Sequence, residues 1–232
     1  MLPKINQPIF NLYLPGIDKK IRYRPFTVKE EKLLLFAQSS EDVDDVITAV
    51  KQLVNNCCLD DVDVDNLPSF DLELFFVNLR AKSVSNIVKI TINEDGVEIP
   101  VEINLDNVQV HSSSNKKRNI LLSDKEQIGV VLRYPTFADV QRYSNIDNSP
   151  DSAINLIIDL IESVYQGEEF YSAKDSSRAE LEEFVQSMNS DQMEKIKEFL
   201  DDMPYVYIEV KYKDAADEEH KKELRGLDSF FG

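Results

Sequence analysis

The sequence contains no tryptophan and only two cysteines, two histidines and six glycines among its 232 residues. The cysteines, Cys57 and Cys58, are adjacent, and a disulfide between neighbouring residues would be strained. We therefore expect two reduced thiols that pack at a helix end. His111 and His220 lie in polar stretches, where a solvated surface position is the usual one, so no catalytic or metal-binding histidine is expected.

Long apolar runs and glycine-rich loops are also missing. No run approaches the roughly 18–20 apolar residues that a membrane span needs, and the first residues lack the apolar core of a signal peptide. Gly16, Gly96 and Gly167 stand alone in turn-like contexts and do not form a phosphate-binding loop. These absences predict a cytoplasmic location, no membrane partner and no cofactor.

Acidic residues are in large excess, with 43 Asp and Glu against 26 Lys and Arg, which gives a formal net charge of -17. Such a charge repels phosphate backbones and anionic lipid, so nucleic acid is not expected as a partner. Hydrophobic residues make up 42% of the chain and charged residues 30%, which is typical of a soluble globular protein. A basic protein surface is one possible partner, and simple solubility is the alternative explanation of the charge.

Hydrophobic periodicity predicts an α+β fold. Apolar residues alternate over residues 10–23 and 88–105, which predicts two β-hairpins, and shorter strands are expected at 120–122 and 128–132. Helical spacing predicts helices over 28–38 and 43–54, a third from Ser69, and a short one over 137–143. Thr27 and Glu30 have the spacing of a capping box at the start of the first of these helices.

The C-terminal part is predicted to be mostly helical. Helices are expected from Pro150 through Val164, from Ser177 and from Ser190, followed by one strand over 205–212 and a charged tail over 215–222. A boundary near 144–150 would divide the chain into a mixed α+β part, 1–144, and a mostly helical part, 145–232. No repeat of fixed period is visible.

An acidic loop at residues 60–66 has the spacing Asp61-x-Asp63-x-Asp65, which invites a calcium-binding interpretation. The next position of such a loop requires glycine and is Asn66, and the twelfth requires a bidentate glutamate and is Leu72. An EF-hand is therefore not expected, whereas weak cation binding by the loop stays open. A carboxylate hydrolase built on this loop is a minor alternative, because no acid, base and pocket can be assembled from the sequence.

Four segments stand out in order along the chain: YRPFTVKEEKLL at 23–34, LDDVDV at 59–64 with LPSFD at 67–71 and LRAKSV at 79–84, IGVVLRYP at 128–135, and LRGLDSFF at 224–231. Together they resemble the baseplate hub and hub-assembly proteins of T-even-like contractile-tailed bacteriophages. The resemblance implies a non-enzymatic hub subunit or hub-assembly protein that binds other tail or baseplate hub proteins. It would act in the host cytoplasm during assembly and, if retained, reside in the tail baseplate. A transient tail-assembly chaperone, absent from the mature virion, is the alternative.

The resemblance also implies cysteine pairs of zinc-ribbon type in two hairpins, but residues 90–105 and 207–224 contain no cysteine. A structural zinc site needs four ligands, so none is expected here. Partner contacts are expected at the basic-aromatic joint, residues 22–26, which links the first predicted hairpin to the first helix, and at the C-terminal segment, residues 224–231. The predicted contact residues are Arg22, Tyr23, Arg24, Phe26, Leu224, Leu227, Phe230 and Phe231.

Overall fold

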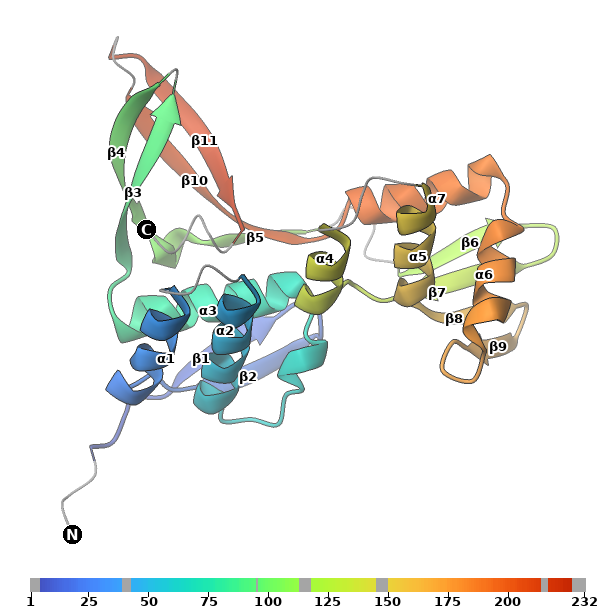
Figure 1. Ribbon diagram of the computed structural model, residues 1–232, viewed down its shortest axis with the longest axis horizontal. Helices are drawn as coiled ribbons and strands as arrows, with labels where there is room; N and C mark the ends of the chain where they lie inside the picture. The colour runs from blue at the N-terminus through green and yellow to red at the C-terminus, as the bar shows by residue number, and fades with distance from the viewer. Residues whose placement is uncertain are drawn as a thin grey trace. The chain divides into compact units, whose positions relative to one another are not determined.

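The computed structural model describes residues 5–38, 43–94, 96–112, 118–144, 150–213 and 217–226. The chain forms two compact units (Figure 1): Met1–His111 together with Tyr205–Gly232, and Ser112–Pro204. The boundary expected near 144–150 falls inside the second unit, and the C-terminal strands belong to the first. Within the described parts, no helix is both long and apolar enough to cross a membrane.

The first unit begins as the sequence predicts. Strands β1 (Phe10–Leu14) and β2 (Lys19–Tyr23) form an antiparallel hairpin, followed by helices α1 (Val28–Gln38) and α2 (Val43–Cys57). A short 3-10 turn, η1 (Val64–Asn66), leads to helix α3 (Ser69–Ser83), which is buried on several sides. The ring of Tyr23 meets that of Phe75 edge-on at 5.4 Å, which joins the hairpin to α3 in one core.

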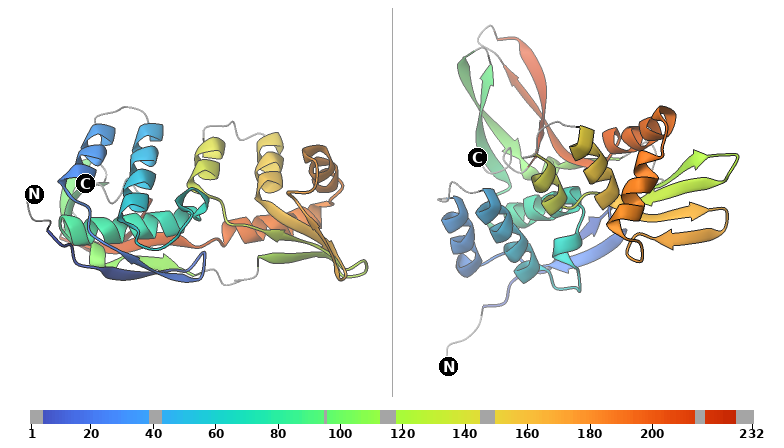
Figure 2. Two further views of the ribbon diagram at one scale, coloured as in Figure 1. Left: turned by 90° about the horizontal axis from the view of Figure 1, so that it is seen from below. Right: turned by 45° about the vertical axis from the view of Figure 1, so that its right-hand side comes forward.

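Two long hairpin-like arms complete the first unit. Strands β3 (Ile87–Glu94) and β4 (Val97–Asn104) form one arm and are followed by a 3-10 turn, η2 (Leu105–Asn107). Strands β5 (Gln109–His111), β10 (Tyr205–Lys213) and β11 (Glu219–Arg225) form a sheet in the order β11-β10-β5. Figure 2 shows the two arms side by side, and β10 contacts β4.

The charged tail predicted over 215–222 is wrong for its described part, because residues 219–222 belong to strand β11. This strand is an edge strand whose exposed positions carry charged side chains, so it has no apolar alternation to reveal it. Lys221 on β11 forms an ion pair with Glu209 on the neighbouring strand β10, with 3.4 Å between Nζ and Oε1.

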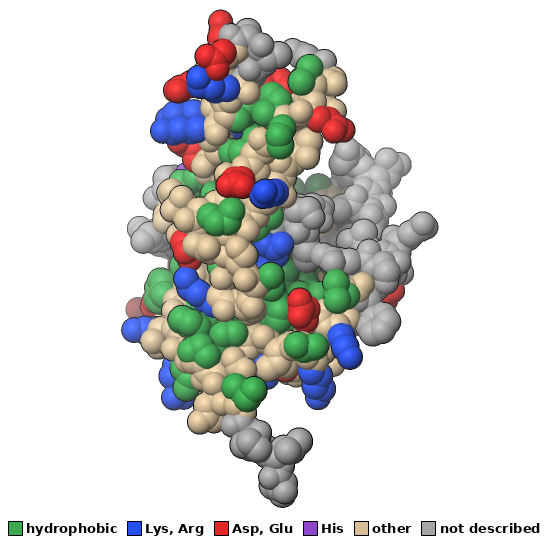
Figure 3. Space-filling model, turned by 90° about the vertical axis from the view of Figure 1, so that its left-hand side faces the viewer, with side chains coloured by type: hydrophobic (Ala, Val, Ile, Leu, Met, Phe, Trp, Pro, Cys, Tyr) green, Lys and Arg blue, Asp and Glu red, His purple; other side chains and the backbone are tan. Residues whose placement is uncertain are grey.

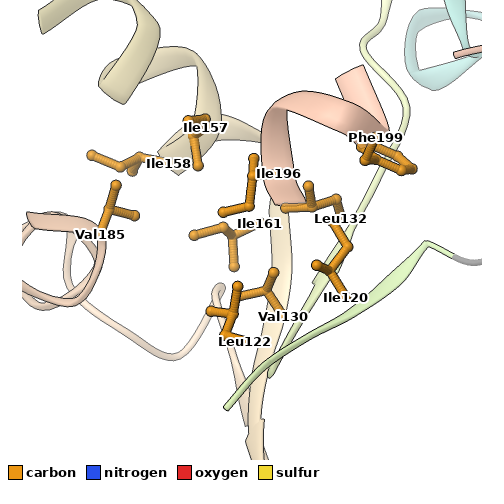
Figure 4. Close-up of a cluster of buried hydrophobic side chains, with 10 residues drawn as sticks. All are labelled: Ile120, Leu122, Val130, Leu132, Ile157, Ile158, Ile161, Val185, Ile196 and Phe199. Atoms are coloured by element: carbon orange, nitrogen blue, oxygen red, sulfur yellow. The ribbon is translucent and has the colours of Figure 1, made fainter. Parts of the chain in front are cut away.

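The second unit contains the antiparallel sheet β6-β7-β8-β9. Its strands are β6 (Asn119–Ser123), β7 (Ile128–Leu132), β8 (Ile161–Gln166) and β9 (Glu169–Ser172). Its helices are α4 (Phe137–Ser144), α5 (Pro150–Leu160), α6 (Arg178–Gln186) and α7 (Ser190–Asp201). Figure 4 shows the core, to which strands β6, β7 and β8 and helices α5, α6 and α7 contribute side chains: Ile120, Leu122, Val130, Leu132, Ile157, Ile158, Ile161, Val185, Ile196 and Phe199.

The expected fold class is wrong in its C-terminal part, which is not mostly helical with a single final strand. Strands β8, β9, β10 and β11 alternate there with helices, and the helix predicted through Val164 ends at Leu160. The β-branched residues Ile161 and Val164 extend along β7 in place of a further helical turn. Residues 165–171 form the rest of β8, a turn at Gly167 and most of β9.

Candidate functional site

Arg24 forms the centre of the predicted joint, between β2 and α1. Its guanidinium donates to the backbone oxygen of Asn56 at 3.0 Å and to Oε1 of Glu30 at 2.9 Å, and its own N–H donates to the oxygen of Cys57 at 3.0 Å. Asn56 and Cys57 are the last residues of α2, where carbonyls lack partners within the helix. One side chain therefore ties the end of the hairpin to the start of α1 and the end of α2.

Glu30 completes this joint and is buried. It accepts a hydrogen bond from the backbone N–H of Thr27, at 2.8 Å, which is one half of the predicted capping box, and another from the Thr27 hydroxyl. Burial alone would raise the pKa of Glu30, but the hydrogen bonds from Arg24 and Thr27 lower it to about 2. The carboxylate is therefore ionised at neutral pH and paired inside the fold.

The structure reveals a second joint that we did not predict. Arg133, which directly follows β7, donates two hydrogen bonds to Asp139, of 2.6 and 3.1 Å, and one to the backbone oxygen of Asp159, of 2.9 Å. Asp139 accepts from the N–H and the hydroxyl of Thr136, at 2.8 and 2.7 Å. Although burial opposes it, the hydrogen bonds from Arg133 and Thr136 lower the pKa of Asp139. The shared spacing Arg-x-x-Thr-x-x-acid is the sequence signal that could have found this joint.

The predicted contact residues near the N-terminus differ in how far they are exposed to solvent. Tyr23 and Phe26 are buried in the core, and Arg24 is engaged in the joint. The Arg22 side chain is 58% exposed and pairs with Asp60 at 2.7 Å. Arg22 is thus the member of this group with a large exposed surface.

The predicted contact residues at the other end of the chain are only partly described. Leu224 is half-buried in strand β11. Leu227, Phe230 and Phe231 lie outside the described residues.

Three of the four carboxylates in the acidic loop are engaged by neighbouring side chains. Asp60 pairs with Arg22, Asp65 pairs with Lys51 at 3.2 Å, and Asp63 accepts from the side chain of Asn66 at 2.7 Å. The loop and α2 line an open groove of about 470 Å³. In the described parts of the chain, no group of three or more His, Cys, Asp or Glu side chains is placed to hold a metal ion.

Exposed apolar side chains are concentrated in the first unit, among the described residues. Ile5 is 87% exposed, Val28 is 68% exposed and Leu35 is 59% exposed. Val28 and Leu35 are seven residues apart on α1 and therefore share one face of the helix, with the exposed Lys32 between them. Figure 3 shows a face of the molecule where hydrophobic side chains lie among basic and acidic ones. Such a face can bury apolar area against another protein.

Comparison with known proteins shows the family of this chain. No curated protein and no solved structure matches it. The family model described as T4 bacteriophage base plate protein matches residues 7–232, which is nearly the whole chain. The chain therefore belongs to the T4 bacteriophage base plate protein family.

Proposed function

We propose that this protein is a non-enzymatic component of the central hub of a contractile-tail baseplate, or a factor that assembles the hub, and that it acts by binding other tail proteins. The observation that carries the proposal is the family match over residues 7–232. The exposed apolar side chains of the first unit support a role in protein binding. The pairing of Asp60, Asp63 and Asp65 within the chain supports a role without catalysis.

We propose that the outer face of α1 is part of the contact surface. Burying Val28 and Leu35 against a partner would remove large apolar side chains from water. Lys32 lies between them, and the exposed Lys29 lies one residue from Val28. A partner with an apolar surface flanked by carboxylates would fit this face.

The surface is tested by replacing Val28 and Leu35 together with glutamate in the phage. We expect the double variant to fold with an unchanged melting temperature, but to lose co-purification with baseplate proteins and to lower phage yield. Val140→Glu, at a 40% exposed apolar position on α4, is the matched control and should behave as wild type. Normal co-purification by the α1 variant would exclude this face as the contact surface.

Mass spectrometry of purified virions tests the hub role. Peptides of this chain at a stoichiometry comparable with other hub proteins would support a structural subunit that resides in the tail baseplate. Abundance in infected-cell lysate with absence from virions would instead support the transient chaperone.

A further inference from the structure

The β1–β2 and β6–β7 hairpins match at a spacing of 109 residues in their turns and second strands, whereas an irregularity between Leu121 and Ser123 shifts the pairing of β6 by one residue. In each, a four-residue turn is closed by a strand pair, Leu14↔Lys19 in the first and Ser123↔Ile128 in the second. The last residue of each turn has a positive φ, 49° at Asp18 and 53° at Gln127. A positive φ is uncommon for residues other than glycine, so its recurrence at matching positions is informative.

The arginine joints match at the same spacing. Arg24 corresponds to Arg133, Thr27 to Thr136, and Glu30 to Asp139. Each arginine also donates to the backbone oxygen of the residue that follows it, at 3.0 Å in the first joint and 3.3 Å in the second. Both acids are buried, and both are bound by the N–H and hydroxyl of their threonine.

The helices that close the two joints also match. The arginine side chains bind the oxygens of Asn56 and Asp159, which are the penultimate residues of α2 and α5. Their backbone N–H groups bind the oxygens of the last residues, at 3.0 Å for Arg24 and 2.9 Å for Arg133. The next residue then pairs with the strand before the joint, as Tyr23↔Cys58 in one unit and Leu132↔Ile161 in the other. Matching residues are 103 apart here instead of 109, because helices α4 and α5 are shorter than α1 and α2.

The two units diverge after this point. In the second unit the chain continues along β7 as β8, as far as the pair Ile128↔Gln166. In the first unit it leaves the strand, and the side chain of Asp60 accepts the hydrogen bond from the backbone N–H of Arg22 at 2.5 Å. The differences thus begin where the shared hairpin, joint and helix pair end.

The second unit lies within the sequence of the first. It is bounded by His111, the end of β5, and Tyr205, the start of β10, and these two residues are partners in the same sheet. Their rings also stack at 4.7 Å. The first unit therefore has the chain topology of a domain that holds an insertion between two paired strands.

We infer that this protein contains two copies of one folding module, residues 10–58 and 119–161, and that the second copy is inserted into the unit that contains the first. Arg24 and Arg133 are equivalent positioning residues of the two copies. Each fixes the angle at which its hairpin meets its helix pair. The sequence signal of this relationship is weak, because the two joints share only the spacing Arg-x-x-Thr-x-x-acid and several of their contacts are made to backbone atoms.

Hydrogen–deuterium exchange of the full-length protein tests this inference. We expect Arg24→Lys to speed exchange in residues 10–58 by about tenfold, because the loss of a forked pair and a helix-end contact favours local opening. Arg133→Lys should do the same in residues 119–161. Thr27→Val and Thr136→Val should each give a smaller effect in the same copy.

The inference would be supported if each substitution speeds exchange only in its own copy, by the same factor in the two copies, and if the arginine variant has a larger effect than the threonine variant in both. An effect that spreads equally over both copies, or a different ranking in the two, would overturn the inference. Arg22→Lys is the matched control, because this arginine precedes the joint and forms an exposed ion pair with Asp60. Lysine variants keep the positive charge and avoid the unfolding that alanine could cause.

Discussion

The buried carboxylate of Asp71 accepts a hydrogen bond of 3.0 Å from the backbone N–H of Gly16, in the turn between β1 and β2. A second hydrogen bond, 3.1 Å long, comes from the N–H of Ile17. Asp71 lies in the first turn of α3, where the helix dipole favours an acid. The contact fixes the hairpin turn against the start of the helix.

Gly16→Ala should destabilise the protein by about 2 kcal/mol, because the turn has no room for a side chain. An added Cβ would lie 2.6 Å from Oδ2 of Asp71 and 2.7 Å from Cγ of Pro68. Urea denaturation measures the effect. Gly96→Asn is the control, since its Cβ would meet no atom within 4 Å and asparagine tolerates a positive φ. Equal stability of Gly16→Ala and wild type would contradict the close packing of the turn.

Asp71 should make the first unit less stable as the pH rises from about 4 to about 6. Burial raises the pKa of Asp71 to about 6, although the hydrogen bonds from Gly16 and Ile17 oppose the rise. An aspartate in the unfolded chain has a pKa of about 3.9, so the folded protein binds the proton more tightly over this range. Stability is therefore lost as the proton leaves, by about 2 kcal/mol.

The measurement compares the free energy of unfolding of wild type and Asp71→Asn at pH 4.5 and 7.5. The advantage of wild type over the variant should shrink by about 2 kcal/mol at the higher pH. Taking this difference cancels the contributions of other acids, such as Glu30, whose lowered pKa has the opposite effect at lower pH. An unchanged difference would show that Asp71 does not titrate in this range.

Gly129→Ala should destabilise the second unit by about 3 kcal/mol. Gly129 on β7 faces Tyr165 on β8, and the tyrosine ring occupies the space of the missing side chain. An added Cβ would also lie 2.5 Å from the backbone oxygen of Ile120. In a double-mutant cycle, combining Gly129→Ala with Tyr165→Ala should cost less than the sum of the single changes. Additive effects would show that the ring is not the obstacle.

Cys57 should react with iodoacetamide at pH 8 at least about a hundredfold more slowly in the folded protein than in the unfolded chain. Its side chain is buried, and burial raises the pKa of the thiol to about 11, which leaves almost no thiolate. The Cys58→Ala variant isolates Cys57 for mass spectrometry. The same variant in concentrated urea gives the reference rate. A native rate close to that reference would contradict a packed, unreactive thiol.

Local signals in the sequence account for the elements that were predicted well. The Thr27–Glu30 cap predicts helix α1 with its observed bounds, and strict alternation predicts the β3–β4 arm. Both depend on neighbouring residues, so they can be read without the rest of the fold.

The elements that were missed depend on distant partners. The stretch 154–164 has both helical spacing and β-branched residues, and pairing with β7 decides that Ile161 begins a strand. Strand β11 consists largely of charged residues and is defined by its pairing with β10. Among the predicted contact residues, Tyr23 and Phe26 are core residues. The pattern of basic and aromatic residues in this segment does not distinguish a surface position from a core position.

Because β5 pairs with β10, the point where the chain leaves the first unit for the second is a suitable insertion site. A segment that leaves from His111 and returns at Tyr205 leaves from and returns to the same rung of a sheet, so its length does not alter the register of the strands that hold it. Inserted segments of different lengths can therefore be accommodated at this site without a change in the pairing of β5 with β10. A fluorescent or affinity tag could be inserted at this same position of the first unit.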